Sequence, residues 1–252
     1  MNRIDNYRDR ASEIYRENRN IILLLAILTT VFNTFFDALD PQGFLGIAVI
    51  ILQIIVTAPL LMCTYHVYTR VIQKKTTDSN FIFSWLTDGK FIIHGIKVQF
   101  LLMIKLIGWY ILYFLIVIMS ALLGSLGVII GTVAGLVLIC YKQLQYNGAL
   151  YECAADPYYY VGAAFDDGIE KMKYCFKDYV SLWMSMCLPL IVVFGILNAI
   201  FEASSIAVVI SFFSNIILNF FIYPRFHITG ILLYNNGNFN HVKDVDNEDT
   251  LM

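Results

Sequence analysis

The chain has 252 residues, of which 59% are hydrophobic and 14% are charged, and its formal net charge at pH 7 is -2. Soluble domains carry roughly 25% charged residues, so this composition indicates a membrane protein. The small net charge gives no reason to expect a nucleic-acid partner. Several apolar runs of about 20 residues have the length that a bilayer-spanning helix needs.

Residues 1–19 carry apolar side chains at spacings of three and four, with arginines on the remaining faces. This pattern predicts a basic amphipathic helix in the headgroup layer, and a solvated extension is the alternative. The apolar run 20–36 follows this long charged segment and lacks a small-residue cleavage site. We therefore expect it to be retained as the first span. The second span is predicted at residues 44–68.

Residues 69–98 are mixed in character, and residues 81–86 suggest a short helix at the membrane interface. Spans three and four are predicted at residues 99–123 and 127–144. Within the fourth span, three glycines recur at intervals of four and share one stripe of the helix: Gly127, Gly131 and Gly135. Such a stripe lets a second helix approach closely, so we interpret it as a packing seam. A flexible hinge is the alternative.

A polar stretch then separates the fourth span from the fifth. Asp156 fits a helix N-cap and Pro157 fits the first turn of the helix that follows it. Apolar residues repeat at helical spacing through residue 176, which predicts a second amphipathic helix. Spans five and six are predicted at residues 179–200 and 206–234, and the polar tail 235–252 is expected to be disordered. We expect one all-α, six-span membrane domain over residues 1–234, with two or three amphipathic helices on its cytosolic side.

Lysine and arginine indicate the orientation of the spans. The N-terminal segment and residues 69–98 hold five each, residues 142–178 hold four, and the C-terminal end holds Arg225 and Lys243. The connections 37–43, 120–127 and 201–205 hold none. By the positive-inside rule, this alternation predicts a multi-pass protein of the cell membrane with both termini in the cytoplasm.

Charged residues inside spans are candidates for function. Counted along each span at about 1.5 Å per residue, the cations fall in the cytosolic third of the membrane or at its interface. They could contact anionic lipids there: Arg70, Lys97, Lys105, Lys142 and Arg225. No carboxylate is expected at mid-depth, which disfavours a proton-coupled carrier. Asn215 and Asn219 share a helix face and are interpreted as interhelical contacts, with substrate ligands as the alternative.

The sequence lacks several common catalytic and cofactor-binding motifs. It has no phosphate-binding loop, no G-x-S-x-G and no H-E-x-x-H, so we do not expect an enzyme or a cofactor. The cysteine count is odd and no C-x-x-C occurs, which predicts neither a disulfide framework nor a metal site. The five are Cys63, Cys140, Cys153, Cys175 and Cys187.

Four local patterns together resemble a bacterial integral membrane family catalogued as domain of unknown function 975. They are the charged segment Tyr7–Asn18 before the first span, the run leading to Ala155-Asp156-Pro157, Met172-Lys173 with Phe176, and Tyr223-Pro224 followed by Gly230 and Tyr234. The chain departs from the family pattern at Gly168, where serine is usual, and at Tyr174, where glycine is usual. The resemblance implies a multi-span bacterial membrane protein and supplies no established activity.

We therefore expect a non-enzymatic helical bundle that acts by contact with the lipid bilayer, with anionic lipids, or with a partner membrane protein. The alternative is a transporter or export component for a small uncharged or amphiphilic solute. In such a transporter, helix kinks at prolines would permit the conformational change. Its cavity would be lined by Asn198, Asn215 and Asn219. An intramembrane enzyme would need a cavity with two convergent ionisable groups.

Overall fold

The computed structural model describes residues 3–37, 39, 43–75, 77–157, 160–201 and 205–249. Over these residues the chain is helical and contains no strand. In chain order the helices are α1 (Arg3–Glu17), α2 (Arg19–Asp37), α3 (Gly43–Ile72), α4 (Ser79–Thr87), α5 (Gly89–Ala121), α6 (Gly124–Ala155), α7 (Val161–Met186), α8 (Leu188–Phe201), α9 (Ser205–Ile217) and α10 (Tyr223–Asp249), with one π-helical turn, η1 (Leu218–Ile222), before the last.

Among the described residues, six stretches are long and apolar enough to cross a membrane. They are Arg19–Phe36, Ile51–Ile72, Gly89–Ala121, Gly124–Ala155, Val161–Phe201 and Val209–Asn236. The chain is therefore an all-α polytopic membrane protein, which confirms the predicted fold class. Most of these helices are longer than predicted, because they continue beyond the apolar runs into a packed region.

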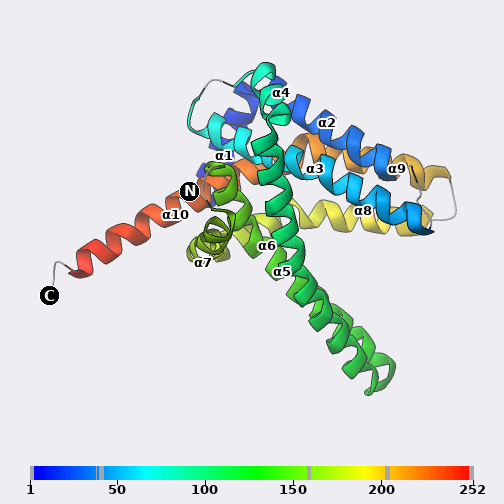
Figure 1. The fold of residues 1–252 in the computed structure, drawn as a ribbon. Helices are drawn as coiled ribbons and strands as arrows, with labels where there is room; N and C mark the ends of the chain where they lie inside the picture. Colours follow the sequence, from blue (N-terminus) through cyan, green and yellow to red (C-terminus); the bar gives the residue numbers. More distant parts are fainter. Residues whose placement is uncertain are drawn as a thin grey trace.

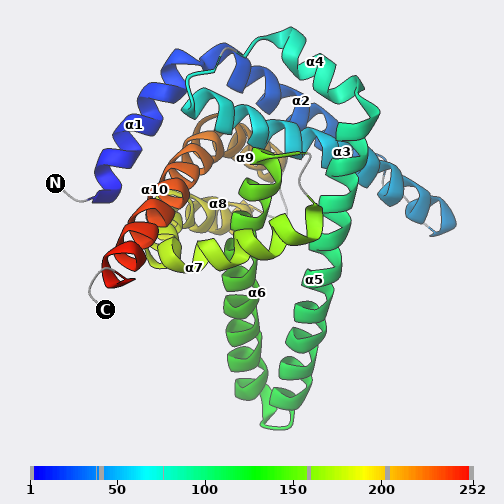
Figure 2. The ribbon, with the colours of Figure 1, turned by 60° about the vertical axis from the view of Figure 1, so that its left-hand side comes forward.

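The spans form three hairpins that diverge from this packed region. Figures 1 and 2 show α2 with α3 and α8 with α9 extending to one side, while α5 with α6 leaves in a different direction. We call the packed region the base. It contains α1, α4, α7, the first part of α10 through Tyr234, and the adjoining ends of α2, α3, α5 and α6. The opposite ends of the hairpins, where α2 ends and α3 begins, where α5 ends and α6 begins, and where α8 ends and α9 begins, are called the tips.

The hydrophobic core lies in the base. Its fully buried side chains include Ile22, Met62, Tyr151, Phe165 and Ile231, which come from five different helices. In contrast, the 14 residues of α8 include none that is buried. The outer part of α5, from residue 99 to residue 121, also includes no buried residue. This distribution fits a membrane protein whose hairpins face lipid and whose helices pack against one another at one end.

The length of α6 places the base relative to the bilayer. Its 32 residues span about 48 Å at 1.5 Å per residue, whereas a hydrocarbon core is about 30 Å thick. Starting from Gly124 at the tip, about 30 Å of helix ends near Leu144. From Leu144 to Ala154 most α6 residues are buried in the base. The base thus begins where the hydrocarbon core would end.

Side-chain caps explain two helix starts at the base. Asp78 accepts a hydrogen bond from the Phe81 amide at 2.8 Å and begins α4, the short helix expected near residues 81–86. Asp88 accepts from the Lys90 amide at 2.9 Å and begins α5. Each carboxylate satisfies an amide that the first turn of a helix leaves without a partner.

The predicted N-cap at Asp156 is wrong. Asp156 is the C-cap of α6, with extended backbone angles of φ -131° and ψ 96°, and α7 begins at Val161 after Tyr160. The reason is that a proline disfavours helical angles in the residue before it, so Pro157 ends α6 at this point. The second amphipathic segment is also continuous with the fifth span, because α7 runs unbroken to Met186. The break falls at Cys187, two residues before Pro189.

The C-terminal segment differs from its prediction. Residues 235–252 were expected to be disordered, but α10 continues as a helix to Asp249 and extends away from the base in Figure 1. No proline or glycine follows Gly237, so the sequence has no strong helix breaker there. Residues 250–252 of the predicted tail lie outside the described residues.

Candidate functional site

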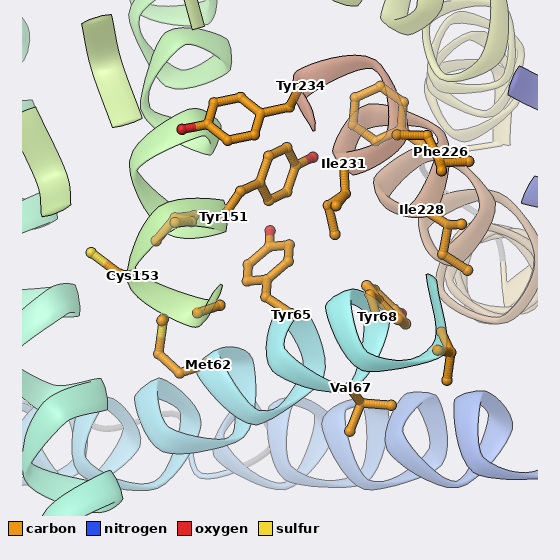
Figure 3. Packing of buried hydrophobic residues seen from close by; sticks show 14 of the residues in the cluster. Met62, Tyr65, Val67, Tyr68, Tyr151, Cys153, Phe226, Ile228, Ile231 and Tyr234 are labelled. Carbon is orange, nitrogen blue, oxygen red and sulfur yellow. The ribbon is translucent and has the colours of Figure 1, made fainter. Parts of the chain in front are cut away.

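The centre of the base is a buried cluster of aromatic side chains around Tyr151. Its hydroxyl oxygen lies 2.8 Å from the Tyr179 hydroxyl and 3.1 Å from His227 Nδ1. Its ring lies between the rings of Tyr65 and Tyr234, with centroid distances of 5.6 Å and 5.9 Å (Figure 3). The cluster therefore joins α3, α6, α7 and α10, and the Tyr151 hydroxyl has hydrogen-bond partners on both α7 and α10.

A carboxylate connects three of these helices. Lys171 on α7 donates to Glu152 Oε1 on α6 at 2.7 Å, and the Tyr234 hydroxyl on α10 donates to Glu152 Oε2 at 2.7 Å. Both oxygens of the carboxylate thus have a partner. The Lys171 side chain is 40% exposed, so solvent screens the ion pair. The Glu152 carboxylate therefore links α6 to α7 and α10.

Two histidines hold the C-terminal end of α6. His66 Nδ1 lies 2.6 Å from the Ala154 carbonyl oxygen, and His94 Nε2 lies 2.9 Å from the Cys153 carbonyl oxygen. Carbonyls in the last turn of a helix have no donor from a following turn, and Pro157 has no N–H to offer. Ring nitrogens from α3 and α5 therefore replace the missing donors, which explains why two histidines lie in the base.

A comparable contact docks α1 against the sixth span. The Tyr15 hydroxyl donates to the Phe220 carbonyl oxygen at 2.9 Å, in the π-helical turn before Pro224. Because proline lacks an N–H, the preceding turn is left with a carbonyl short of a helical donor. The Arg225 guanidinium lies 4.9 Å from the centroid of the Tyr15 ring. One tyrosine thus binds both the backbone and a cation of the sixth span.

The five cations predicted to contact lipid lie in and around the base, and four of them have identified neighbours. Three lie over aromatic rings: Arg70 at 4.4 Å from the Phe81 centroid, Lys142 at 4.3 Å from that of Trp109, and Arg225 over Tyr15. Lys105 pairs with Asp166 at 3.4 Å, with both side chains exposed, and Lys97 is exposed. Four of the five cations are therefore each held by a different neighbour, and the structure spreads the five over several helices.

Arg225 also belongs to a groove that the sequence did not indicate. The groove has a volume of about 510 Å³ and lies between α1, the start of α2 and the sixth span. Three arginines line it, Arg16, Arg19 and Arg225, together with two carboxylates, Asp9 and Glu13. Tyr15, Phe221 and Ser12 complete the lining. We call it the arginine groove.

Two cavities flank His227. The larger, of about 310 Å³, lies between α6, α7 and α10, and the smaller, of about 130 Å³, lies between α2, α3 and the sixth span. Three side chains line both cavities: Tyr65, Tyr223 and His227. These side chains separate the two spaces. We call the larger space the aromatic–amide cavity, because it is also lined by Gln143, Asn147, Trp183 and Phe226.

The three predicted seam glycines lie against α5. A Cβ atom at Gly127 or Gly131 would overlap Ser120, and one at Gly135 would overlap the Tyr113 ring. The absence of these side chains is what allows α5 and α6 to pair closely.

The asparagines do not converge as the transport alternative expected. Asn219 lines the smaller cavity, Asn215 is exposed, and Asn198 accepts a hydrogen bond from Ser211 at 3.0 Å. The interhelical contact in this region is therefore made by Asn198, and the two asparagines on one helix face have different surroundings.

In the part of the chain that the structure describes, no three His, Cys, Asp or Glu side chains are placed to hold a metal ion. The five cysteines are free thiols, of which Cys140 is exposed and the other four are buried. Searches among protein families, characterised proteins and solved structures found no match to this chain. The class of protein is thus defined by its own fold, a polytopic α-helical membrane protein.

Proposed function

We propose that this chain is a non-enzymatic membrane protein that binds anionic lipid headgroups at its base. The base would face the cytoplasm, with both termini on that side of the cell membrane. The arginine groove is the observation that carries this proposal. Three arginines line this concave surface, and a guanidinium group can bind phosphate through two parallel hydrogen bonds.

The position of the groove supports a lipid phosphate as its ligand. Arg225 lies about 16 residues along the helical path from Val209, where the apolar stretch begins, or roughly 24 Å. Adding the residues between the tip and Val209 brings Arg225 close to the far boundary of a bilayer core about 30 Å thick. Arg16 and Arg19 come from the corner between the amphipathic α1 and the first span. The groove would therefore lie at headgroup depth.

The orientation is supported by the distribution of positive charge. The tips carry no lysine or arginine, whereas the base and its connections contain them throughout. Anionic lipids of a cytoplasmic leaflet attract basic residues by about 1 kcal/mol for each charge near the surface. Carboxylates Asp9 and Glu13 in the groove reduce its net charge, so selectivity for a phosphate is expected to depend on the guanidinium geometry rather than on bulk charge.

Native mass spectrometry of protein extracted from mixed-lipid membranes tests the proposal. Wild type should retain phosphatidylglycerol or cardiolipin in preference to phosphatidylcholine. The triple variant Arg16→Gln, Arg19→Gln, Arg225→Gln should lose this preference. The matched control replaces three other cations, Arg8, Arg10 and Lys173, by glutamine, and should keep it. Equal loss in both triple variants would show a nonspecific charge effect and contradict a groove.

A second candidate function is transport of a small uncharged or amphiphilic solute. The two cavities that share Tyr65, Tyr223 and His227 favour it, because movement of those side chains would join the spaces. Reconstituted vesicles should then release glycerol or glucose faster than protein-free vesicles. Replacing Tyr223 by alanine should accelerate the release. Equal release from vesicles with and without the protein would exclude this candidate for these solutes.

A further inference from the structure

The aromatic–amide cavity has the chemistry of a site for a neutral group rich in hydroxyls. Its lining offers the amides of Gln143 and Asn147, the phenol of Tyr223 and the imidazole of His227. Trp183 and Phe226 add flat apolar surfaces. Its described lining includes no carboxylate, ammonium or guanidinium group. Such a site can hydrogen-bond hydroxyls through amides and cover a ring with aromatic faces, but it cannot neutralise a charge.

The nearest cation on α6 is already engaged. The Lys142 ammonium lies over the Trp109 ring and donates to Gln145 Oε1 at 3.1 Å. It is absent from the lining of the cavity, although Lys142 precedes Gln143 in the sequence. The volume of about 310 Å³ falls at the lower end of the range for small-molecule sites, which suits one ring-sized polar group.

The depth of the cavity suits an amphiphile. Cys140, Gln143 and Asn147 lie 16, 19 and 23 residues from Gly124, or about 24, 29 and 35 Å along α6. The cavity therefore crosses the level at which a hydrocarbon core about 30 Å thick would end. A molecule with its polar group in this cavity would have its apolar part on the hydrocarbon side of Cys140.

The hairpins provide room for that apolar part. Beyond the base, the α5–α6 hairpin diverges from α8 and α9, as both ribbon views show (Figures 1 and 2). Apolar side chains on α6 and α8 are exposed there, including Val133, Val137, Val192 and Val193. Acyl chains in this region would meet apolar surfaces, which is the environment they favour.

We propose that the aromatic–amide cavity binds a neutral, polyhydroxylated group, carried by an amphiphile such as a glycolipid. The site shares no residue with the arginine groove, so it is a second binding site with a different headgroup chemistry. A free sugar could offer the same hydroxyls, and the experiment distinguishes these two sources. The depth of the cavity and the divergence of the hairpins favour the amphiphile.

Cys140 provides a reporter within the site. It lines the cavity and is exposed, whereas the four other cysteines are buried. The rate at which N-ethylmaleimide modifies Cys140 can be followed by mass spectrometry in lipid nanodiscs, with Cys140→Ser as the blank. Modification should slow severalfold when monoglucosyl diacylglycerol is added to phosphatidylcholine. Phosphatidylglycerol added in the same amount should leave the rate unchanged.

Variants then test the amides. The Gln143→Leu, Asn147→Leu double variant should need about tenfold more glucolipid for the same protection, since each lost hydrogen bond weakens binding modestly. Asn147 also hydrogen-bonds the Tyr179 side chain, so Gln143→Leu alone is measured in parallel and keeps that contact. Gln53→Leu is the matched control, because Gln53 lies on α3 outside the lining of this cavity, and it should behave as wild type.

Three results would overturn the whole proposal, and a fourth would overturn the amphiphile alone. Protection by phosphatidylglycerol equal to that by the glucolipid would exclude a neutral site. If the glucolipid protected Cys140 equally well in wild type, in Gln143→Leu and in the double variant, the amides would be excluded as ligands. No protection by either the glucolipid or excess free glucose would exclude a polyhydroxylated ligand. Protection by free glucose in plain phosphatidylcholine nanodiscs would support the chemistry of the site and overturn the amphiphile as its source. None of these results depends on lipid retention at the arginine groove.

Discussion

His94 Nε2 lies 2.9 Å from the carbonyl oxygen of Cys153, 59 positions away in the sequence, and His94 is buried. The carbonyl belongs to the last turn of α6, where the chain supplies no backbone donor. A side chain of α5 thus completes the end of a different helix. This contact, with its counterpart at His66, fixes where α6 stops and where the connection to α7 begins.

Replacing His94 by leucine should destabilise the protein by about 1–3 kcal/mol, because a buried carbonyl then has no donor. His94→Gln should recover part of this loss, since its amide can donate to the same oxygen. Unfolding in mixed detergent micelles measures the change in free energy. Lys90→Gln, an exposed change on the same helix, is the control. Equal stability of His94→Leu and wild type would show that this hydrogen bond does not support the fold.

The Tyr15 contact predicts graded effects at α1. Tyr15→Phe removes the hydroxyl that binds the Phe220 carbonyl and keeps the ring beneath Arg225, so the loss should be about 1 kcal/mol. Tyr15→Leu also removes the cation–π contact and should lose roughly 0.5–1 kcal/mol more. Amide hydrogen exchange in α1 and η1 should increase in the same order. Unchanged exchange in both variants would mean that α1 docks by other contacts.

The crossing of α6 and α7 depends on two glycines, Gly148 and Gly168. A Cβ atom on Gly168 would lie 2.5 Å from the Cα atom of Ala149, which belongs to the backbone of α6. Gly168→Ala should therefore destabilise the protein by about 1–3 kcal/mol, in spite of the better helix propensity of alanine.

Gly195→Ala is the matched control for this crossing, because nothing lies within 4 Å of the added Cβ on α8. The control should be neutral or slightly stabilising. Unfolding in mixed detergent micelles compares the free energies of the two variants. If Gly168→Ala were as stable as Gly195→Ala, α6 and α7 could move apart without a loss of stability, and the prediction would be wrong.

The lengths of the apolar runs predicted the six candidate spans, because crossing a bilayer strongly constrains the length and composition of a helix. The spacing of Gly127, Gly131 and Gly135 pointed to one stripe, and the structure places α5 against it. The helix ends were harder to predict. Asp156 before Pro157 has the residue types of an N-cap and a first helical turn, so residue type alone favoured the start of a helix. Its extended backbone, which the proline favours, makes it the end of α6.

The two proposed binding sites could not be found from the periodicity of the sequence. The arginine groove and the aromatic–amide cavity combine residues from three or more helices that are far apart in the sequence. One signal was available: Pro157 and Pro224 each remove a backbone donor, so a buried carbonyl nearby needs a side-chain partner. This requirement predicts that a side-chain donor binds the free carbonyl before each proline. His94 binds the Cys153 carbonyl before Pro157, and Tyr15 binds the Phe220 carbonyl before Pro224.

The central claim is that the base lies on the cytoplasmic side and the tips lie across the membrane. Single cysteines at Leu39, Leu123, Lys75 and Lys173, introduced into Cys140→Ser protein, test it with a membrane-impermeant maleimide in intact cells. Leu39→Cys and Leu123→Cys should be labelled in intact cells, whereas Lys75→Cys and Lys173→Cys should be labelled only after the cells are permeabilised. Labelling of the two base positions in intact cells would contradict it.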